Sequence, residues 1–199
     1  MLGKLILVGG GARSGKSQFA LERALREGAS RAFVATATAF DDEMKERIAR
    51  HQQDRMGTFT TIEAPTELSV AALRMSRYDV VLLDCLTLYI SNLLLAVPDI
   101  EHLTRNDLRD LESSCLQQVQ TGIDALRART ETLIVVTNEV GQGVVPVSRL
   151  GRIFRDIAGR VNQSVAHSAA EVWFCAFGIP LRLKPSLSER NPLDSHGGS

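Results

Sequence analysis

The nine residues GGGARSGKS at positions 9–17 constrain the fold more than any other stretch of this chain. Gly10, Gly15, Lys16 and Ser17 fit the pattern G-x-x-x-x-G-K-[ST] of a phosphate-binding loop that joins a strand to a helix. Glycines let successive backbone N–H groups point inward, and the N-terminus of the following helix adds partial positive charge. The stretch therefore predicts a nucleotide site in which Lys16 reaches the β and γ phosphates.

Apolar runs alternate with helical patterns along the rest of the chain. The runs lack polar alternation, which predicts strands covered on both faces, at 4–9, 31–36, 79–85, 132–138 and 171–177. Helical periodicity occupies 16–27, 40–56, 66–76, 86–95, 104–129 and 149–169, with Thr104 or Asn106 as the N-cap of the fifth helix. An edge strand of a hairpin is expected within 177–184, with Gly178 and Pro180 in the turn. This order predicts an α/β fold, a mostly parallel sheet flanked by helices.

Length and composition limit the classes of protein. A chain of 199 residues is expected to form one P-loop nucleotide-binding domain over 1–184, followed by a disordered tail at 185–199 that is rich in Ser, Pro and Gly. Lys plus Arg equals Asp plus Glu at 23 each, so we expect no nucleic-acid partner. An odd number of widely spaced cysteines, and no apolar stretch long enough for a membrane span, predict buried thiols and a cytoplasmic protein.

Two carboxylates compete as the acid that helps a phosphate loop to hold Mg²⁺. Asp84 follows four apolar residues, as in a Walker B strand, and would share the metal with Ser17. Glu139 ends the next predicted strand, and both acids could face the nucleotide because ligands bind beyond the carboxyl ends of parallel strands. Alternatively, Asp84 caps the helix that starts near Thr87.

A histidine lies between two arginines on one stripe of the predicted helix at 40–56. Arg47, His51 and Arg55 are spaced at i, i+4 and i+8. A neutral imidazole can attack an α-phosphorus and expel pyrophosphate, and guanidinium groups suit a site that holds phosphate. Taken alone, these residues are better explained as a solvated charged helix face with an incidental histidine.

Two later stretches have no chemistry that the residues alone define. The segment 136–146, with Asn138 and Glu139, suggests a loop at the strand ends that covers a substrate. On the last helix, four polar residues suit intersubunit salt bridges and substrate contact equally well: Arg155, Asp156, Arg160 and Asn162.

Six motifs, taken together, closely resemble one enzyme family: GGARSGKS, ATATAFDDEM, RIARHQQDR, LLDCLTLYISNLL, VTNEVGQGVVP and FRDIAGRVNQ. The family is the bifunctional adenosylcobinamide kinase / adenosylcobinamide-phosphate guanylyltransferase of cobalamin biosynthesis, and the resemblance runs from about residue 4 to about residue 183. It implies phosphorylation of adenosylcobinamide by a nucleoside triphosphate, ATP or GTP, and then transfer of GMP from GTP through a guanylylated histidine. It also implies a RecA-like P-loop domain that assembles as a homotrimer.

The resemblance assigns roles to particular positions. His51 matches the guanylylated intermediate, and Lys16 is its catalytic partner in the phosphate loop; Mg²⁺ would be held by Ser17 and Asp84. The guanine-nucleotide contacts map to Gly10, Gly11, Ala12, Arg13, Ser14, Gly15, Lys16, Ser17, Ala35, Thr36, Ala37, Gln52, Gln53, Asp54, Arg55, Glu63 and Asp84.

Two other functions compete with this one. The first is a P-loop small-molecule kinase in which His51 is inert. The second is a RecA-type ATPase that acts on nucleic acid, which the balanced charge and the 5% of aromatic residues argue against.

Overall fold

A seven-stranded sheet organises the computed structural model, which describes residues 1–38 and 57–185. The strand order is β3-β2-β4-β5-β1-β6-β7. Neighbouring strands are parallel except β6 and β7, which form an antiparallel hairpin. The strands span Lys4–Gly10 (β1), Arg31–Ala35 (β2), Thr60–Glu63 (β3), Tyr78–Asp84 (β4), Thr130–Val136 (β5), Glu171–Ala176 (β6) and Ile179–Lys184 (β7). The expected mostly parallel α/β sheet is therefore confirmed.

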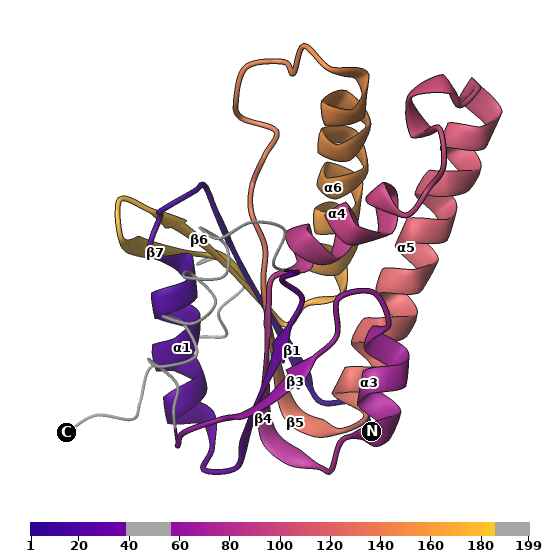
Figure 1. Ribbon diagram of the computed structural model, residues 1–199. Helices are drawn as coiled ribbons and strands as arrows, with labels where there is room; N and C mark the ends of the chain where they lie inside the picture. The colour runs from indigo at the N-terminus through magenta and orange to yellow at the C-terminus, as the bar shows by residue number, and fades with distance from the viewer. Residues whose placement is uncertain (39–56, 186–199) are drawn as a thin grey trace.

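Helices cover both faces of the sheet. They span Lys16–Glu27 (α1), Leu68–Arg74 (α3), Leu86–Leu95 (α4), Arg105–Arg127 (α5) and Arg149–Ser168 (α6), with a short 3-10 helix at Ile100–His102. Figure 1 shows α1 on one side of the sheet and α3, α5 and α6 on the other. None of the helices in the described parts of the chain combines the length and apolar character that crossing a bilayer requires.

The two-residue period of the strands divides the core into two clusters. On β1, Ile6 and Val8 pack with Ala20 and Ala24 of α1. The alternate residues of β1, Leu5 and Leu7, pack in the larger cluster, which also holds buried side chains of α3, α4, α5 and α6. Position along each strand therefore predicts which helices a side chain faces.

Most of the predicted elements are confirmed to within two residues. Thr104, rather than Asn106, is the N-cap of α5, and its side chain forms a capping box with Asp107. All three cysteines are free and buried, as expected. The predicted helix at 40–56 and the predicted disordered tail fall on residues 39–56 and 186–199, which lie outside the described residues.

At one edge of the sheet, the predicted hairpin turn is confirmed for Gly178 but wrong for Pro180. The hairpin turn is made by Phe177 and Gly178, which both have positive φ, at 54° and 79°. Two residues in this conformation suit the right-handed twist of a hairpin. Pro180 instead lies within β7, opposite Cys175. The edge strand β3 was not predicted from the sequence.

Candidate nucleotide-binding site

The phosphate loop leaves the carboxyl end of β1 at Gly10, where a larger residue would not fit. A Cβ at this position would lie 2.5 Å from the carbonyl oxygen of Cys175 and 2.5 Å from Oγ of Ser14, and φ is +154°. At the other end of the loop, Gly15 has φ +88° and would place a Cβ 3.0 Å from Cα of Gly178. At both positions, close contacts and a positive φ therefore favour glycine over any residue with a Cβ.

Helix α1 begins at Lys16 without a side-chain cap. Its N-cap is Gly15, which makes no side-chain capping hydrogen bond, and its first turn holds no acidic residue. The first N–H groups of a helix have no partner within the helix, so they are ready donors to an anion. The observed geometry is that of a helix terminus that can receive phosphate.

Neighbouring segments hold the loop in place. The N–H of Gly178 donates to the carbonyl oxygen of Ser14 at 3.0 Å, and the N–H of Glu139 donates to that of Gly10 at 3.1 Å. Lys16 turns back over the loop, and its Nζ donates to the carbonyl oxygen of Gly11 at 3.0 Å. The ammonium group therefore lies against the backbone that would surround a phosphate.

Three predicted contacts lie in one row across the sheet. Ala35 of β2 pairs with Asp84 of β4 on one side and with Glu63 of β3 on the other. The alternation of each strand places this row on the side of α1, because Ile62, Val34 and Leu83, one residue earlier, pack in the opposite cluster. Asp84 and Glu63 therefore share a face of the sheet with Lys16.

The pKa of the Cys85 thiol is shifted by burial and by the charges of Asp84 and Lys16. Burial, and to a smaller extent the charge of Asp84, raise its pKa to about 11 against the opposing charge of Lys16. Both charged groups are therefore close enough to act on the same buried atom. The site brings an ammonium and a carboxylate to the carboxyl ends of β1 and β4.

The structure distinguishes between the two candidate acids. The carboxylate of Glu139 accepts the N–H of Gly141 at 2.6 Å, within its own loop. The N-cap of α4 is Cys85, whose side chain makes no capping hydrogen bond. The N-cap position itself therefore belongs to Cys85, and Asp84, one residue earlier, is the acid placed on the face of Lys16.

Thr36 is fully buried and fixes the segment that follows Asp84. Its hydroxyl donates to the carbonyl oxygen of Cys85 at 2.7 Å and accepts the N–H of the same residue at 2.9 Å. Asn92 of α4 donates to the carbonyl oxygens of Thr36 and Pro65, both at 2.9 Å. Asn92 is a positioning residue that the sequence analysis missed, and the signal was an amide within the apolar helix LTLYISNLLL.

The polar residues of α6 have partners within the same chain. Arg160 pairs with Glu112 at 3.0 Å, and Arg155 pairs with Asp156 at 3.1 Å. Asn162 accepts from the hydroxyl of Thr137 and donates to the carbonyl oxygen of Asn138, just beyond β5. The two predicted roles of these residues, intersubunit salt bridges and substrate contact, stay predictions.

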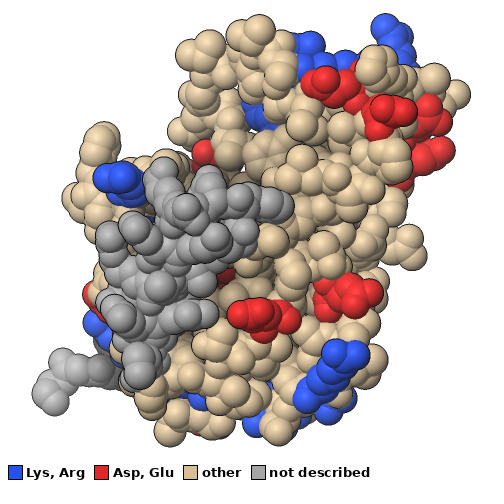
Figure 2. Space-filling model, in the orientation of Figure 1, with Lys and Arg blue, Asp and Glu red and all other residues tan. Residues whose placement is uncertain are grey.

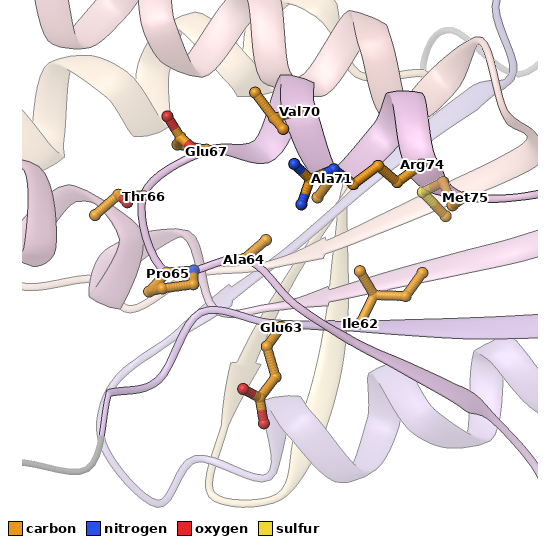
Figure 3. Close-up of a pocket in the computed structure, with 10 residues that line it drawn as sticks. All are labelled: Ile62, Glu63, Ala64, Pro65, Thr66, Glu67, Val70, Ala71, Arg74 and Met75. Atoms are coloured by element: carbon orange, nitrogen blue, oxygen red, sulfur yellow. The ribbon is translucent and has the colours of Figure 1, made fainter.

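A cavity of about 380 Å³ lies beside β3 and α3, apart from the phosphate loop. Its lining includes Val70 and Arg74 of α3 and Glu63 of β3. Figure 3 shows the carboxylate of Glu63 pointing away from Val70 and Arg74. Glu63 therefore borders the cavity with its backbone, while its carboxylate is directed to the other side of the strand.

The remaining predicted residues are distributed between exposed positions and the undescribed segment. Ala12 and Arg13 are exposed on the loop, and Ser17 and Ala37 are half-buried. On the face drawn in Figure 2, Lys and Arg side chains occur in separate groups with a broad uncharged area between them. Six residues with predicted roles lie outside the described residues: Arg47, His51, Gln52, Gln53, Asp54 and Arg55.

Comparison with known proteins identifies one family and several close relatives. The family model described as "Cobinamide kinase / cobinamide phosphate guanyltransferase" matches residues 6–183. The "Bifunctional adenosylcobalamin biosynthesis protein CobU" of Escherichia coli (strain K12) is 40% identical over 181 residues, which cover 90% of this chain and 99% of that protein. Its namesake in Salmonella typhimurium is 39% identical with the same coverage. The "Bifunctional adenosylcobalamin biosynthesis protein CobP" of Pseudomonas aeruginosa is 38% identical, covering 89% of this chain and 96% of that protein.

Proposed function

Because this chain belongs to the cobinamide kinase / cobinamide phosphate guanyltransferase family, it is a kinase and guanylyltransferase of adenosylcobalamin biosynthesis, and we propose that one phosphate loop serves both reactions. The observation that carries the proposal is the uncapped start of α1, with Lys16 folded over the loop. The matched region, residues 6–183, includes the loop and His51.

In the kinase reaction, the hydroxyl of adenosylcobinamide attacks the γ-phosphorus of a nucleoside triphosphate, ATP or GTP. A bond forms between that oxygen and phosphorus, the bond to the bridging oxygen breaks, and the diphosphate leaves; the hydroxyl proton is released. Lys16 and the first N–H groups of α1 stabilise the charge on the phosphate oxygens. Ser17 and Asp84 offer the hard oxygen ligands that Mg²⁺ prefers, and the ion would supply further neutralisation of charge.

In the guanylyl transfer, His51 attacks the α-phosphorus of GTP. A phosphorus–nitrogen bond forms and pyrophosphate leaves; the phosphate of adenosylcobinamide phosphate then attacks the same phosphorus, which frees His51 and gives adenosylcobinamide-GDP. Arg47 and Arg55, four residues to either side of His51 in the sequence, would neutralise phosphate charge.

Intact-protein mass spectrometry after incubation with GTP and Mg²⁺ tests the guanylyl transfer. We expect an acid-labile gain of one GMP that His51→Ala and Lys16→Ala both abolish. His167→Ala is the matched control, since it removes an exposed imidazole at the far end of α6. A protein that binds GTP but gains no mass would support the competing function, a P-loop kinase without guanylyl transfer.

The proposal extends to assembly and location. The guanine nucleotide would be held by contacts with residues 52–55, residues 35–37 and Glu63. A homotrimer in the cytoplasm is the expected form, and light scattering after size-exclusion chromatography measures the assembly directly.

A further inference from the structure

The segment that follows β5 enters the site between its two charged groups. In the sheet, β5 lies between β4, which ends at Asp84, and β1, which ends at the phosphate loop. Residues just beyond Val136, the last residue of β5, therefore emerge between the carboxylate and the loop. Neither the family assignment nor the motif of the phosphate loop gives this segment a role.

The pairing with β1 continues beyond the end of β5. Thr137 donates its N–H to the carbonyl oxygen of Val8 at 3.0 Å, and Glu139 donates to that of Gly10 at 3.1 Å. The hydroxyl of Thr137 donates to Oδ1 of Asn162 on α6 at 2.7 Å, so Thr137 faces the side of α6. Alternation then places Asn138 on the opposite face, the side of α1 and Lys16.

The backbone of Asn138 is fixed on both sides. Its N–H donates to Oγ1 of Thr87 at 2.6 Å, and its carbonyl oxygen accepts from Nδ2 of Asn162 at 3.1 Å. The residue is half-buried, and within residues 1–38 and 57–185 the hydrogen bonds of Asn138 involve its backbone and not its side-chain amide. A donor carried on a fixed backbone is preorganised and can stabilise charge without rearranging.

We propose that the side-chain amide of Asn138 donates a hydrogen bond to a γ-phosphate oxygen of the bound nucleoside triphosphate. This inference rests on the proposed kinase function, in which Lys16 reaches the β and γ phosphates. Lys16 lies against Gly11, next to the glycine that pairs with Glu139, so a phosphate held by the ammonium lies beside Asn138. During transfer Asn138 exchanges no proton; it stabilises the charge on the oxygens of the phosphoryl group.

Two substitutions at one position separate a phosphate contact from a structural role. Asn138→Ala removes the donor, and Asn138→Asp keeps the shape but places a negative charge against the phosphate. We expect kcat of the kinase reaction to fall about 100-fold in the Ala variant and further in the Asp variant. A merely structural role predicts the reverse order, because the Asp side chain is nearly isosteric with Asn.

Nucleotide affinity tests the same contact without the acceptor substrate. Calorimetry measures the dissociation constants of a non-hydrolysable ATP analogue and of ADP. The ratio of the two constants gives the contribution of the γ-phosphate to affinity. We expect Asn138→Ala to reduce the preference for the triphosphate about tenfold, and Asn138→Asp to reduce it more, with ADP affinity unchanged. Equal preference in the wild type and both variants would overturn the inference, whereas a wild type that does not phosphorylate adenosylcobinamide would overturn the proposed function instead.

Asn162→Ala tests whether Asn138 depends on its backbone anchor. We expect a lower kcat with an unchanged KM for the nucleotide, since the donor remains but is less well placed. Gln163→Ala is the matched control, because Gln163 is exposed on the same helix. Wild-type kcat in Asn162→Ala would contradict the positioning role.

Discussion

Glu171 joins three elements that support the phosphate loop, and its replacement gives a stability effect whose pH dependence can be calculated. It is the first residue of β6, and its side chain is 7% exposed. Its carboxylate accepts from Nζ of Lys4 at 2.5 Å, from Arg23 of α1 at 3.1 Å and from Nε1 of Trp173 at 2.9 Å. One carboxylate therefore connects β1, α1 and β6.

These contacts lower the pKa of Glu171 against the effect of burial. Burial raises the pKa, but the hydrogen bonds from Lys4 and Trp173 and the charge of Arg23 outweigh it and lower the pKa from 4.5 to about 2. At about 1.4 kcal/mol per pKa unit the shift corresponds to about 3 kcal/mol. Lys4 is 39% exposed, so screening by solvent reduces this to about 2 kcal/mol.

The sign of the pH dependence follows from the lowered pKa. The stabilisation is fully present above about pH 4.5, the value in the unfolded chain, and is lost as the pH falls toward about 2. Glu171→Gln cannot ionise, so we expect it to be less stable than the wild type by about 2 kcal/mol at pH 7 and by about half of that at pH 3.

Urea denaturation followed by circular dichroism measures both differences. Glu131→Gln is the matched control, because Glu131 pairs with Arg77 at 2.6 Å but the two side chains are 69% and 61% exposed. Such a pair contributes at most about 1 kcal/mol. A Glu171→Gln variant as stable as the control at pH 7, or a difference that grows as the pH falls, would refute the reasoning.

Three further predictions concern the site and its support. Gly10→Ala should abolish nucleotide binding in calorimetry, because its Cβ would meet the carbonyl oxygen of Cys175 and Oγ of Ser14. Thr36→Val should destabilise the fold by about 2 kcal/mol in urea denaturation, because both buried hydrogen bonds to Cys85 are lost, while Thr38→Val at an exposed position should change little. Mass spectrometry should find the cysteines unreactive to iodoacetamide in the native protein and reactive in urea, since burial raises the pKa values of the Cys85 and Cys115 thiols to about 11.

The sequence predicted buried elements better than edge elements. Strands such as β4 and β5 have continuous apolar runs because helices cover both of their faces. The edge strand β3 is only four residues long, reads TTIE, and has three exposed positions, so it presents no apolar run to recognise. A proline is typical of a turn, but an edge strand such as β7 also accommodates Pro180, because its missing N–H need not pair with a neighbouring strand.

The phosphate loop was predictable because the positive φ angles and close contacts of Gly10 and Gly15 require glycine. The polar contacts around it were not, since they join residues far apart in the sequence. Thr36 and Cys85 are 49 residues apart, and Thr36 and Asn92 are 56 apart. Such pairs follow from the order of the strands, which a single sequence does not give.

The choice between Asp84 and Glu139 shows how strand register determines a site. In the sequence both acids follow apolar runs, and this pattern alone does not choose between them. In the sheet, Asp84 pairs with Val136 of β5, and Val136 packs with the α1 cluster. A shift of one residue along a strand moves a side chain to the opposite face. Glu139, three positions beyond Val136, therefore belongs to the other face, whereas Asn138, two positions beyond, returns to the face of Lys16.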